Sequence, residues 1–147
     1  PRSQKTGYFG DITRTVVRGR ASQAIRKLYH TVERAQEIGF ENIRHNASAK
    51  EVHVKIKEFF EKDGYKTGKM NGRMQGFFHG TGHGLGLQIH EPPSISVRGT
   101  VLRAGHVVTV EPGLYYLGLG GVRIEDVAHV TATGSVNMTR VPKVLEV

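Results

Sequence analysis

The stretch from His79 to Asp126 constrains the fold more than any other part of this chain. It begins with three histidines on a glycine-rich backbone, His79, His83 and His90. Helical periodicity is absent, and short β-branched runs alternate with glycine or proline turns, as in the run Val-Thr-Val before Glu111. Such runs are typical of strands joined by tight turns. The stretch therefore predicts short strands that project polar side chains into a shared site.

Two amphipathic helices are predicted upstream of this stretch. Apolar residues at helical spacing follow Ser22, so the first helix is expected to begin there and to end near Gly39. The second is expected to begin at Ser48, where Ser-Ala-Lys-Glu is a capping box, and to end at Asp63-Gly64. Both helices are interpreted as packing elements rather than as sources of catalytic groups.

The rest of the chain adds strands and one loop to this outline. Residues 8–19 are rich in aromatic and β-branched residues, which predicts a strand, and further strands are expected at 106–111 and 122–131. Residues 65–75 are polar and contain glycine, which predicts a loop. On the second helix, His53 is expected to face solvent together with neighbouring lysines.

The order of these elements is a strand, two helices and then several strands. This order predicts an α+β fold with an antiparallel sheet and helices on one of its faces. A chain of 147 residues is long enough for one domain with a hydrophobic core. It contains no internal repeat and no low-complexity segment.

The composition narrows the possible functions. The chain contains no cysteine, which excludes disulfides, thiolate metal ligands and a cysteine nucleophile. No apolar run reaches the length of about 18 residues that a transmembrane helix needs, and the first residues lack the apolar core of a signal peptide. These features favour a cytoplasmic protein without a membrane partner. The absence of an initiator methionine suggests a partial polypeptide.

The net charge of +8 raises the alternative of a nucleic-acid-binding protein. The lysine and arginine residues are scattered, however, without interleaved aromatic residues for base stacking and without a nucleic-acid motif. A solvated basic surface explains the same charge. No nucleic-acid partner is therefore expected.

One histidine and three carboxylates stand out as candidate metal ligands: Asp11, His83, Glu111 and Glu125. Asp11 interrupts a predicted strand, where aspartate is depleted, and a carboxylate there needs a partner, a metal or solvent. An oxygen-rich set with one imidazole and no sulfur suits Mn²⁺, Co²⁺, Fe²⁺ or Zn²⁺. Carboxylates can bridge two cations about 3.5–4 Å apart that activate a shared water. The set therefore indicates metal-assisted hydrolysis, with a glutamate as proton shuttle and a histidine donating to the oxyanion.

Two rival motifs are weaker. The glycine-rich residues 80–86 could form a phosphate loop, but the Lys-Ser/Thr of a P-loop is missing and Pro92-Pro93 prevents a following helix. A serine or threonine hydrolase would need a nucleophile elbow, which the chain lacks. Each histidine taken alone would more often be structural, yet three within twelve residues favour a site.

Four motifs in the same order resemble the pita-bread metallopeptidases, the family of methionine aminopeptidase, aminopeptidase P and prolidase. They lie at 10–15 (Gly-Asp-Ile-Thr-Arg-Thr), 79–93, 109–115 and 123–127, and the end around Pro142 extends the match over nearly the whole chain. The resemblance implies the pita-bread fold with a curved antiparallel sheet. It also implies that residues 1–147 are the C-terminal portion of a metallopeptidase catalytic domain.

The resemblance implies a role for each candidate ligand. Asp11 corresponds to the second metal aspartate, which bridges both ions, and Glu125 corresponds to the final bridging glutamate. His83 corresponds to the single histidine ligand, and Glu111 to the glutamate that binds the same ion and also serves as proton shuttle. Two Mn²⁺ ions are the cofactors that the family implies, with Co²⁺, Zn²⁺ and Fe²⁺ as alternatives.

Three catalytic residues beyond the ligands are implied as well. His90 corresponds to the histidine that stabilises the tetrahedral intermediate, and His79 to a histidine that contacts the substrate. His79 and Arg123 together are similar to the enzymes that cut before proline, whereas methionine aminopeptidases normally lack both. The resemblance therefore implies cleavage of proline-containing peptides at Xaa-Pro bonds, of the aminopeptidase P or prolidase type. A methionine aminopeptidase, a creatinase-like hydrolase or a binding protein of the same fold are the alternatives.

One ligand of the family has no counterpart in this chain. The first metal aspartate of the family precedes the second, and residues 1–10 contain no aspartate or glutamate. In the family the missing aspartate binds only the second ion, and the four ligands present are the full set for the first. The resemblance therefore implies one complete and one incomplete metal site. Catalysis by this polypeptide alone is therefore in question. A sheet that lacks part of its usual cover would also favour a homodimer.

Overall fold

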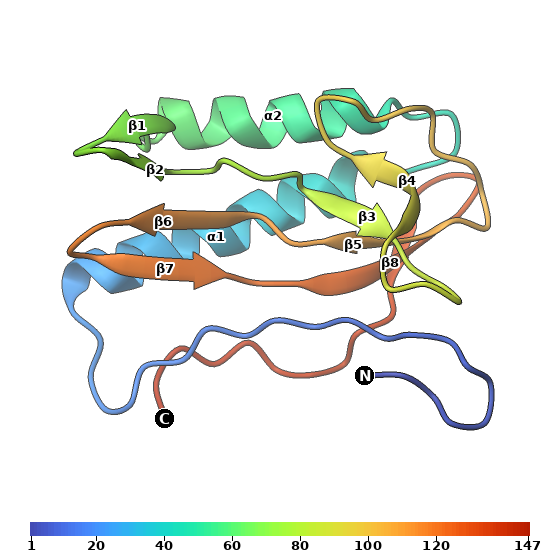
Figure 1. Ribbon diagram of the computed structural model, residues 1–147, viewed down its shortest axis with the longest axis horizontal. Coiled ribbons are helices and arrows are strands. Elements are labelled where there is room, and N and C mark those ends of the chain that lie inside the picture. The colour runs from blue at the N-terminus through green and yellow to red at the C-terminus, as the bar shows by residue number, and fades with distance from the viewer.

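The computed structural model describes residues 1–147 as two helices packed against a layer of nine short strands. The helices are α1 (Gln23–Asn42) and α2 (Ala49–Lys62). Figure 1 shows both helices on one face of the strand layer, with the N-terminal segment and the C-terminal tail running side by side below it. Neither helix combines the length and the apolar character that crossing a membrane requires. The predicted α+β arrangement is confirmed.

The strands pair in antiparallel fashion throughout. They are β1 (Gly68–Met70), β2 (Arg73–Gln75), β3 (Gly82–Gly84), β4 (Glu91–Ile95), β5 (Val107–Val110), β6 (Gly113–Tyr116), β7 (Gly120–Arg123), β8 (Asp126–Val130) and β9 (Ser135–Asn137). Five of them form a sheet in the order β4-β3-β5-β8-β9, and the others form the hairpins β1-β2 and β6-β7. The prediction of short strands in the stretch 79–126 is therefore confirmed.

A single hydrophobic core fills the space between the helices and the strands. Leu28 and Val32 of α1, Ile56 and Phe60 of α2, and Val108 of β5 belong to it and are fully buried. Each helix directs one apolar stripe at the sheet, which is the arrangement that the helical spacing predicts. The opposite face of the strand layer is left free to carry polar side chains.

The helix boundaries agree with the prediction except at the end of α1. Helix α2 begins as expected, because Ser48 Oγ accepts the Glu51 N–H at 3.2 Å. Helix α1 runs through Gly39 and ends only at Asn42. A Cβ at position 39 would lie 2.6 Å from Cγ1 of Val110. Glycine at this position therefore permits close contact between helix and sheet rather than ending the helix.

Residues 8–19 are extended but do not form the predicted strand. Their pairing is limited to isolated bridges, Phe9 with Arg2, Thr13 with Glu125 and Val17 with Glu146. The neighbouring segments explain this result. One neighbour is the break between β7 and β8, and the other is the proline-containing C-terminal tail, which cannot donate a full ladder of hydrogen bonds.

Two other predictions of secondary structure, a loop and a strand, need correction. The stretch 65–75, predicted as a loop, contains the hairpin β1-β2, in which Asn71 and Gly72 have φ angles of 50° and 79°. Positive φ at both positions is the geometry that suits a two-residue hairpin turn. The predicted strand 122–131 is divided into β7 and β8, because the ladder stops at Ile124 and Glu125 bridges to the N-terminal segment instead.

His53 does not face solvent as predicted. It is only 6% exposed, its ring centroid lies 5.2 Å from that of Phe77, and its Nδ1 atom lies 3.0 Å from Oγ1 of Thr81. Both partners belong to the connection between β2 and β3, which covers this flank of α2. The contact is tertiary, so spacing within the helix could not reveal it.

Candidate metal centre

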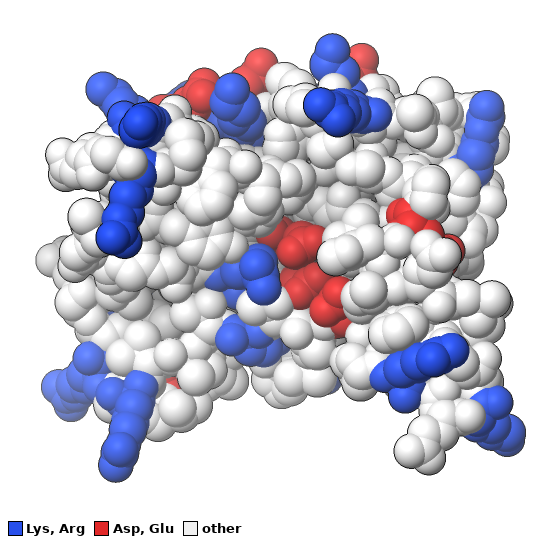
Figure 2. Space-filling model, viewed as in Figure 1, with Lys and Arg blue, Asp and Glu red and all other residues white.

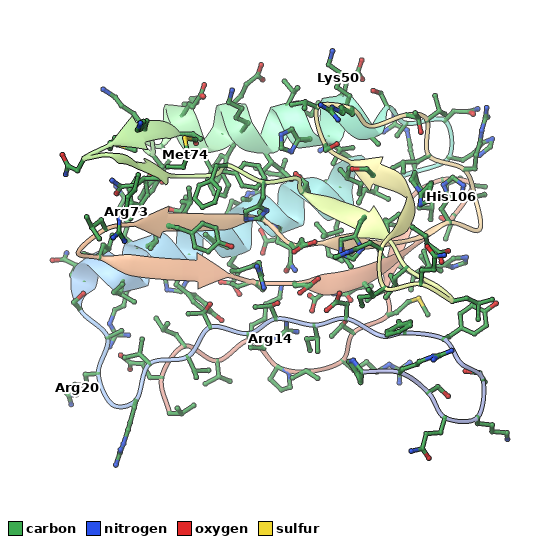
Figure 3. All side chains as sticks on the ribbon, viewed as in Figure 1. Arg14, Arg20, Lys50, Arg73, Met74 and His106 are labelled. Carbon is green, nitrogen blue, oxygen red and sulfur yellow. The ribbon has the colours of Figure 1, made fainter.

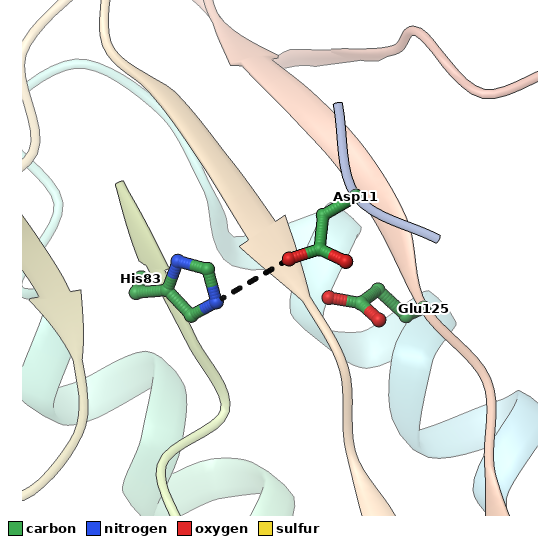
Figure 4. A group of neighbouring side chains, drawn as sticks. All are labelled: Asp11, His83 and Glu125. Carbon is green, nitrogen blue, oxygen red and sulfur yellow. Dashed lines mark ion pairs between the residues drawn. The ribbon is translucent and has the colours of Figure 1, made fainter. Parts of the chain in front are cut away.

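Three side chains from distant parts of the sequence converge at one point. Asp11 comes from the extended N-terminal segment, His83 from β3, and Glu125 from the break between β7 and β8. One possible ligand atom of each lies within 4.8 Å of the others, and His83 Nε2 is 3.9 Å from Asp11 Oδ2 (Figure 4). In Figure 2, which is viewed as in Figure 1, acidic side chains gather near the middle of the molecule, and most basic side chains lie toward its margin.

Glu111 joins this group through His83. It directly follows β5, and its Oε1 atom lies 3.2 Å from Nε2 of His83. The hydroxyl of Thr109 donates to the same carboxylate oxygen at 3.2 Å and accepts the His83 N–H at 3.0 Å. Thr109 therefore connects the two side chains from the neighbouring strand. The structure brings together all four residues that were predicted as metal ligands.

The glycine-rich sequence around His83 allows β3 to approach β5. A Cβ at position 82 would lie 1.9 Å from the carbonyl oxygen of Thr109, so any side chain in place of Gly82 would push the strands apart. The Glu111 N–H donates to the Thr81 carbonyl at 2.7 Å, which continues the contact beyond β5. The glycines here serve strand packing, and this packing places His83 beside Glu111.

The imidazole of His83 is oriented to bind through Nε2. Its Nδ1 atom lies 3.1 Å from the carbonyl oxygen of Gly84, so Nδ1–H donates there, and Nε2 faces the carboxylates, where it can bind an ion once it has lost its proton. Burial lowers the pKa of His83, but the hydrogen bond and charge of Glu111, with Asp11, outweigh burial and raise it. Burial likewise raises the pKa of Glu111, but the partnership with His83 outweighs it and lowers that pKa.

Glu125 is a buried carboxylate among other carboxylates. It is 3% exposed, and the hydroxyl of Thr13 donates to its Oε2 atom. Burial is the main cause that raises the pKa of Glu125 to about 7; the Thr13 hydrogen bond opposes it, and the charges of Glu111 and Asp11 add to it. Two or three carboxylates in one site cannot all ionise without a compensating charge.

The donor set fits a divalent cation. It offers three carboxylates and one imidazole whose free nitrogen faces them. Oxygen donors with one imidazole and no sulfur suit Mn²⁺, Fe²⁺, Co²⁺ or Zn²⁺. A positive ion would also offset the charges of Glu111 and Asp11, which add to the effect of burial on the pKa of Glu125. With one carboxylate able to move a proton, such a centre can support hydrolysis.

Two further predicted residues, Arg123 and His79, lie around Glu111 and Tyr115. The Nε atom of Arg123 is 4.0 Å from Oε2 of Glu111. The Nε2 atom of His79 is 3.0 Å from the hydroxyl of Tyr115. Burial lowers the pKa of His79, which leaves the ring neutral at pH 7 and able to accept the tyrosine proton.

His90, the remaining predicted residue, lies in the connection between β3 and β4. It is exposed, and its ring stands edge-on to that of His83, with centroids 4.1 Å apart and an interplanar angle of 88°. Its ring contacts His83 rather than the carboxylates, and its exposed face is accessible from solvent. All the predicted site residues therefore border one centre.

Sequence reasoning missed three residues of this centre, Thr13, Thr109 and Tyr115. The two threonines each lie two positions from a predicted ligand, Asp11 or Glu111, in extended backbone. Side chains two positions apart share a face of such backbone, so this spacing was a usable signal. Tyr115 reaches His79 through the fold alone, and no local pattern indicates that contact.

Comparisons with known proteins identify relatives that match almost the whole chain. The profile of metallopeptidase family M24 matches residues 3–132. The Xaa-Pro dipeptidase of Pyrococcus furiosus is 40% identical over 139 residues, which cover 94% of this chain and 38% of that protein. The solved structure of an Xaa-Pro dipeptidase from Bacillus anthracis is 41% identical with a TM-score of 0.85, covering 95% of this chain and 38% of that one.

A second solved structure is similar over the same range. An X-Pro aminopeptidase from Thermotoga maritima has a TM-score of 0.86 and 34% identity, covering 96% of this chain and 38% of that one. The chain therefore spans about 38% of the length of these relatives.

Proposed function

This chain belongs to metallopeptidase family M24 and has its pita-bread fold, and from that premise we propose that it takes part in the hydrolysis of peptides at Xaa-Pro bonds. The observation that carries the proposal is the convergence of Asp11, His83, Glu111 and Glu125. Relatives named Xaa-Pro dipeptidase and X-Pro aminopeptidase support the substrate class. Residues 1–147 are proposed to be the C-terminal portion of the catalytic domain.

The four converging residues are the proposed ligands of a divalent ion, with Mn²⁺ favoured over Co²⁺, Zn²⁺ or Fe²⁺ by the family resemblance. An ion held there would act as a Lewis acid toward the peptide carbonyl and would activate water. Because the four ligands are the full set for one ion, a single tight site is expected in this polypeptide. A titration that finds two equally tight Mn²⁺ sites would contradict this expectation.

Glu111 is the proposed proton shuttle. Burial raises the pKa of Glu111, but the contact with His83 outweighs burial and lowers that pKa, so the carboxylate is ionised at neutral pH. An ionised carboxylate can accept a proton from water and pass it to the departing amine. Arg123, whose Nε atom lies 4.0 Å from Oε2, places a positive charge near this group. His90 is exposed and is proposed to donate to the developing oxyanion.

An aromatic group beside the ligands supports the recognition of proline. The ring centroids of Phe78 and Tyr115 are 5.4 Å apart, and those of Tyr115 and His79 are also 5.4 Å apart. Phe78 is 47% exposed, so the group offers an apolar surface to a substrate. A proline ring is apolar and packs well on aromatic side chains. His79 is therefore assigned to contact with the substrate.

A peptide panel with Mn²⁺ tests this proposal. The peptides Ala-Pro, Ala-Pro-Ala and Met-Ala-Ser are incubated with the wild-type chain and with Glu111→Gln, which keeps the side-chain shape but cannot take up a proton. Cleavage of a proline peptide by the wild type alone is the expected result. The two proline peptides separate a dipeptidase from an aminopeptidase.

The remaining outcomes contradict the proposal in different ways. Cleavage of Met-Ala-Ser alone would indicate a methionine aminopeptidase. Tight metal binding without cleavage of any peptide would favour a non-peptidase member of the family, such as a creatinase-like hydrolase or a binding protein.

A further inference from the structure

Arg14 binds the backbone of Glu125 and of Thr13, the residue whose side chain contacts the Glu125 carboxylate. Its Nη1 group donates to the carbonyl oxygens of Thr13 at 2.9 Å and of Glu125 at 2.7 Å. These two residues are also joined to each other, because the Glu125 N–H donates to the Thr13 carbonyl at 3.0 Å and the Thr13 hydroxyl donates to the Glu125 carboxylate. The guanidinium therefore holds the pair that orients this candidate ligand.

The other donors of Arg14 bind Asp126 and the C-terminal tail. The Nη2 group donates to Oδ1 of Asp126 at 2.6 Å and to the Val141 carbonyl at 2.7 Å, and Nε donates to the Pro142 carbonyl at 3.2 Å. Figure 3 shows Arg14 where the N-terminal segment passes beneath the strands. An arginine has five N–H donors, and all five are used. None remains for a substrate, so the role of this side chain is internal.

The partners of Arg14 are themselves held in place. Asp126 is 1% exposed, and its Oδ2 atom accepts from Asn137 Nδ2 at 3.0 Å and lies 3.7 Å from Lys143 Nζ. The C-terminal tail is fixed along the N-terminal segment, since the Val17 N–H donates to the Leu145 carbonyl at 2.7 Å. The guanidinium therefore connects a fixed tail to a fixed strand.

We propose that Arg14 is a positioning residue that couples the C-terminal tail to the metal centre through Glu125 and Thr13. The inference rests on the proposed function, because it assigns Arg14 to the support of a ligand of that centre. A planar guanidinium is required, since its donors point in fixed directions toward four carbonyls and one carboxylate. A lysine offers three donors from a single point and cannot reach this set.

The test measures Mn²⁺ binding rather than turnover. Mn²⁺ is added to the wild-type chain and to Arg14→Lys, and free Mn²⁺ is followed by its solution EPR signal well below the melting temperature of each protein. Arg14→Lys is expected to bind Mn²⁺ about 10–100-fold more weakly, as is typical when a residue that orients a ligand is lost. A purely structural role would lower the melting temperature and leave this affinity unchanged.

Arg26→Lys is the matched control. Arg26 also reaches the C-terminal tail, where its Nη2 atom pairs with Glu146, but it touches no residue of the metal centre. Exposed ion pairs contribute little to stability. The Mn²⁺ affinity of Arg26→Lys is therefore expected to stay within about twofold of the wild type. Asp126→Asn, which removes the charge opposite Arg14 and keeps the shape, is expected to fall between the two.

The outcomes separate this inference from the proposed function. Wild-type Mn²⁺ affinity in folded Arg14→Lys, or an equal loss in Arg26→Lys, overturns the positioning role and leaves the proposed function intact. Circular dichroism shows whether Arg14→Lys is folded. If it is unfolded, a wild-type Mn²⁺ affinity in Asp126→Asn overturns the positioning role instead. A wild-type chain that binds no Mn²⁺ overturns the proposed function and the positioning role together.

Discussion

The buried imidazole of His53 and the hydroxyl of Thr81 form a hydrogen bond, with Nδ1 3.0 Å from Oγ1. The carbonyl of Thr81 in turn accepts the N–H of Glu111 at 2.7 Å. Helix α2 contributes no candidate metal ligand, yet through His53 it contacts the side chain of Thr81, whose carbonyl binds the proposed proton shuttle. The helix therefore supports the centre in addition to packing against the sheet.

Replacing His53 with glutamine is expected to make the stability of the chain less sensitive to acid. Burial lowers the pKa of His53, and Lys57 and His79 act in the same direction. Above about pH 6.5 this side chain is neutral in both states. As the pH falls below that value, the unfolded chain takes up a proton that the folded chain refuses, so the free energy of unfolding decreases.

Urea titrations at about pH 7.5 and about pH 5.5 measure this effect. The decrease on acidification should be smaller in His53→Gln than in the wild type. His30→Gln is the control, because the side chain of His30 on α1 is 69% exposed. An identical decrease in His53→Gln and in the wild type would show that this imidazole does not resist protonation.

Binding of a metal ion is expected to release protons near neutral pH. Because the pKa of Glu125 in the metal-free chain is raised to about 7, this carboxyl is largely protonated at slightly acidic pH. A ligand must give up its proton to bind a cation, and His83, whose pKa is also raised, adds to the release. Calorimetry of Mn²⁺ binding in two buffers of different ionisation enthalpy counts these protons.

The pH dependence of this release gives the control. At about pH 6 the binding heat should depend on the buffer, and at about pH 8.5 the dependence should largely vanish. The carboxyl of Glu125 also affects the stability of the metal-free chain, and the pH dependence of this effect is opposite to that of a carboxylate in an ordinary ion pair. Its raised pKa stabilises the folded state below the usual carboxyl pKa, and the contribution is lost as the pH rises to about 7. Buffer-independent heat at both pH values would be inconsistent with a protonated ligand.

The neighbouring imidazoles of His83 and His90 are expected to respond differently to alanine substitution. His83 Nε2 faces the carboxylates, so His83→Ala should weaken Mn²⁺ binding by more than about 100-fold, beyond the loss typical of an indirect contact. His90→Ala should bind the ion almost as the wild type does but cleave Ala-Pro about 100-fold more slowly. Parallel EPR titrations and peptide assays measure both. Equal loss of metal binding in the two variants would show that His90 is a ligand.

Gly39→Ala is expected to destabilise the chain by about 1–3 kcal/mol, the usual cost of overpacking a core. The new methyl group would lie 2.6 Å from Cγ1 of Val110 and 3.4 Å from Cδ1 of Ile56. Gly68→Ala is the control, because a Cβ at that position meets nothing within 4 Å. Urea denaturation of the three proteins gives the comparison, and equal midpoints would show that α1 can move away from β5.

The candidate ligands were predictable because each one interrupts a local pattern. Asp11 stands in a β-branched run, Glu111 and Glu125 follow apolar runs, and His83 lies between glycines. A charged group in such a place costs free energy unless it has a partner. The structure brings these four side chains together, and their roles as ligands stay predictions. The helices were predictable for a similar reason, since capping and apolar spacing are local signals.

The features that sequence reasoning missed depend on contacts between distant segments. Residues 8–19 have the composition of a strand, but a ladder needs a continuous neighbour, and the tail and the break at Glu125 do not supply one. His53 looked exposed because the segment that covers it lies outside its helix. By contrast, Asn71-Gly72 was a local hairpin signal that could have identified β1 and β2.

The contacts of Arg14 also imply an order of events while the chain is being synthesised. The carbonyls of Val141 and Pro142, which hold the guanidinium, leave the ribosome long after Asp11 and His83. Chains emerge from the N-terminus at a limited rate, so an ion that arrives early meets a site whose Glu125 is not yet held in place. Metal loading is therefore expected to follow translation, and a ribosome that stalls before residue 141 would release a chain that holds its ion more weakly.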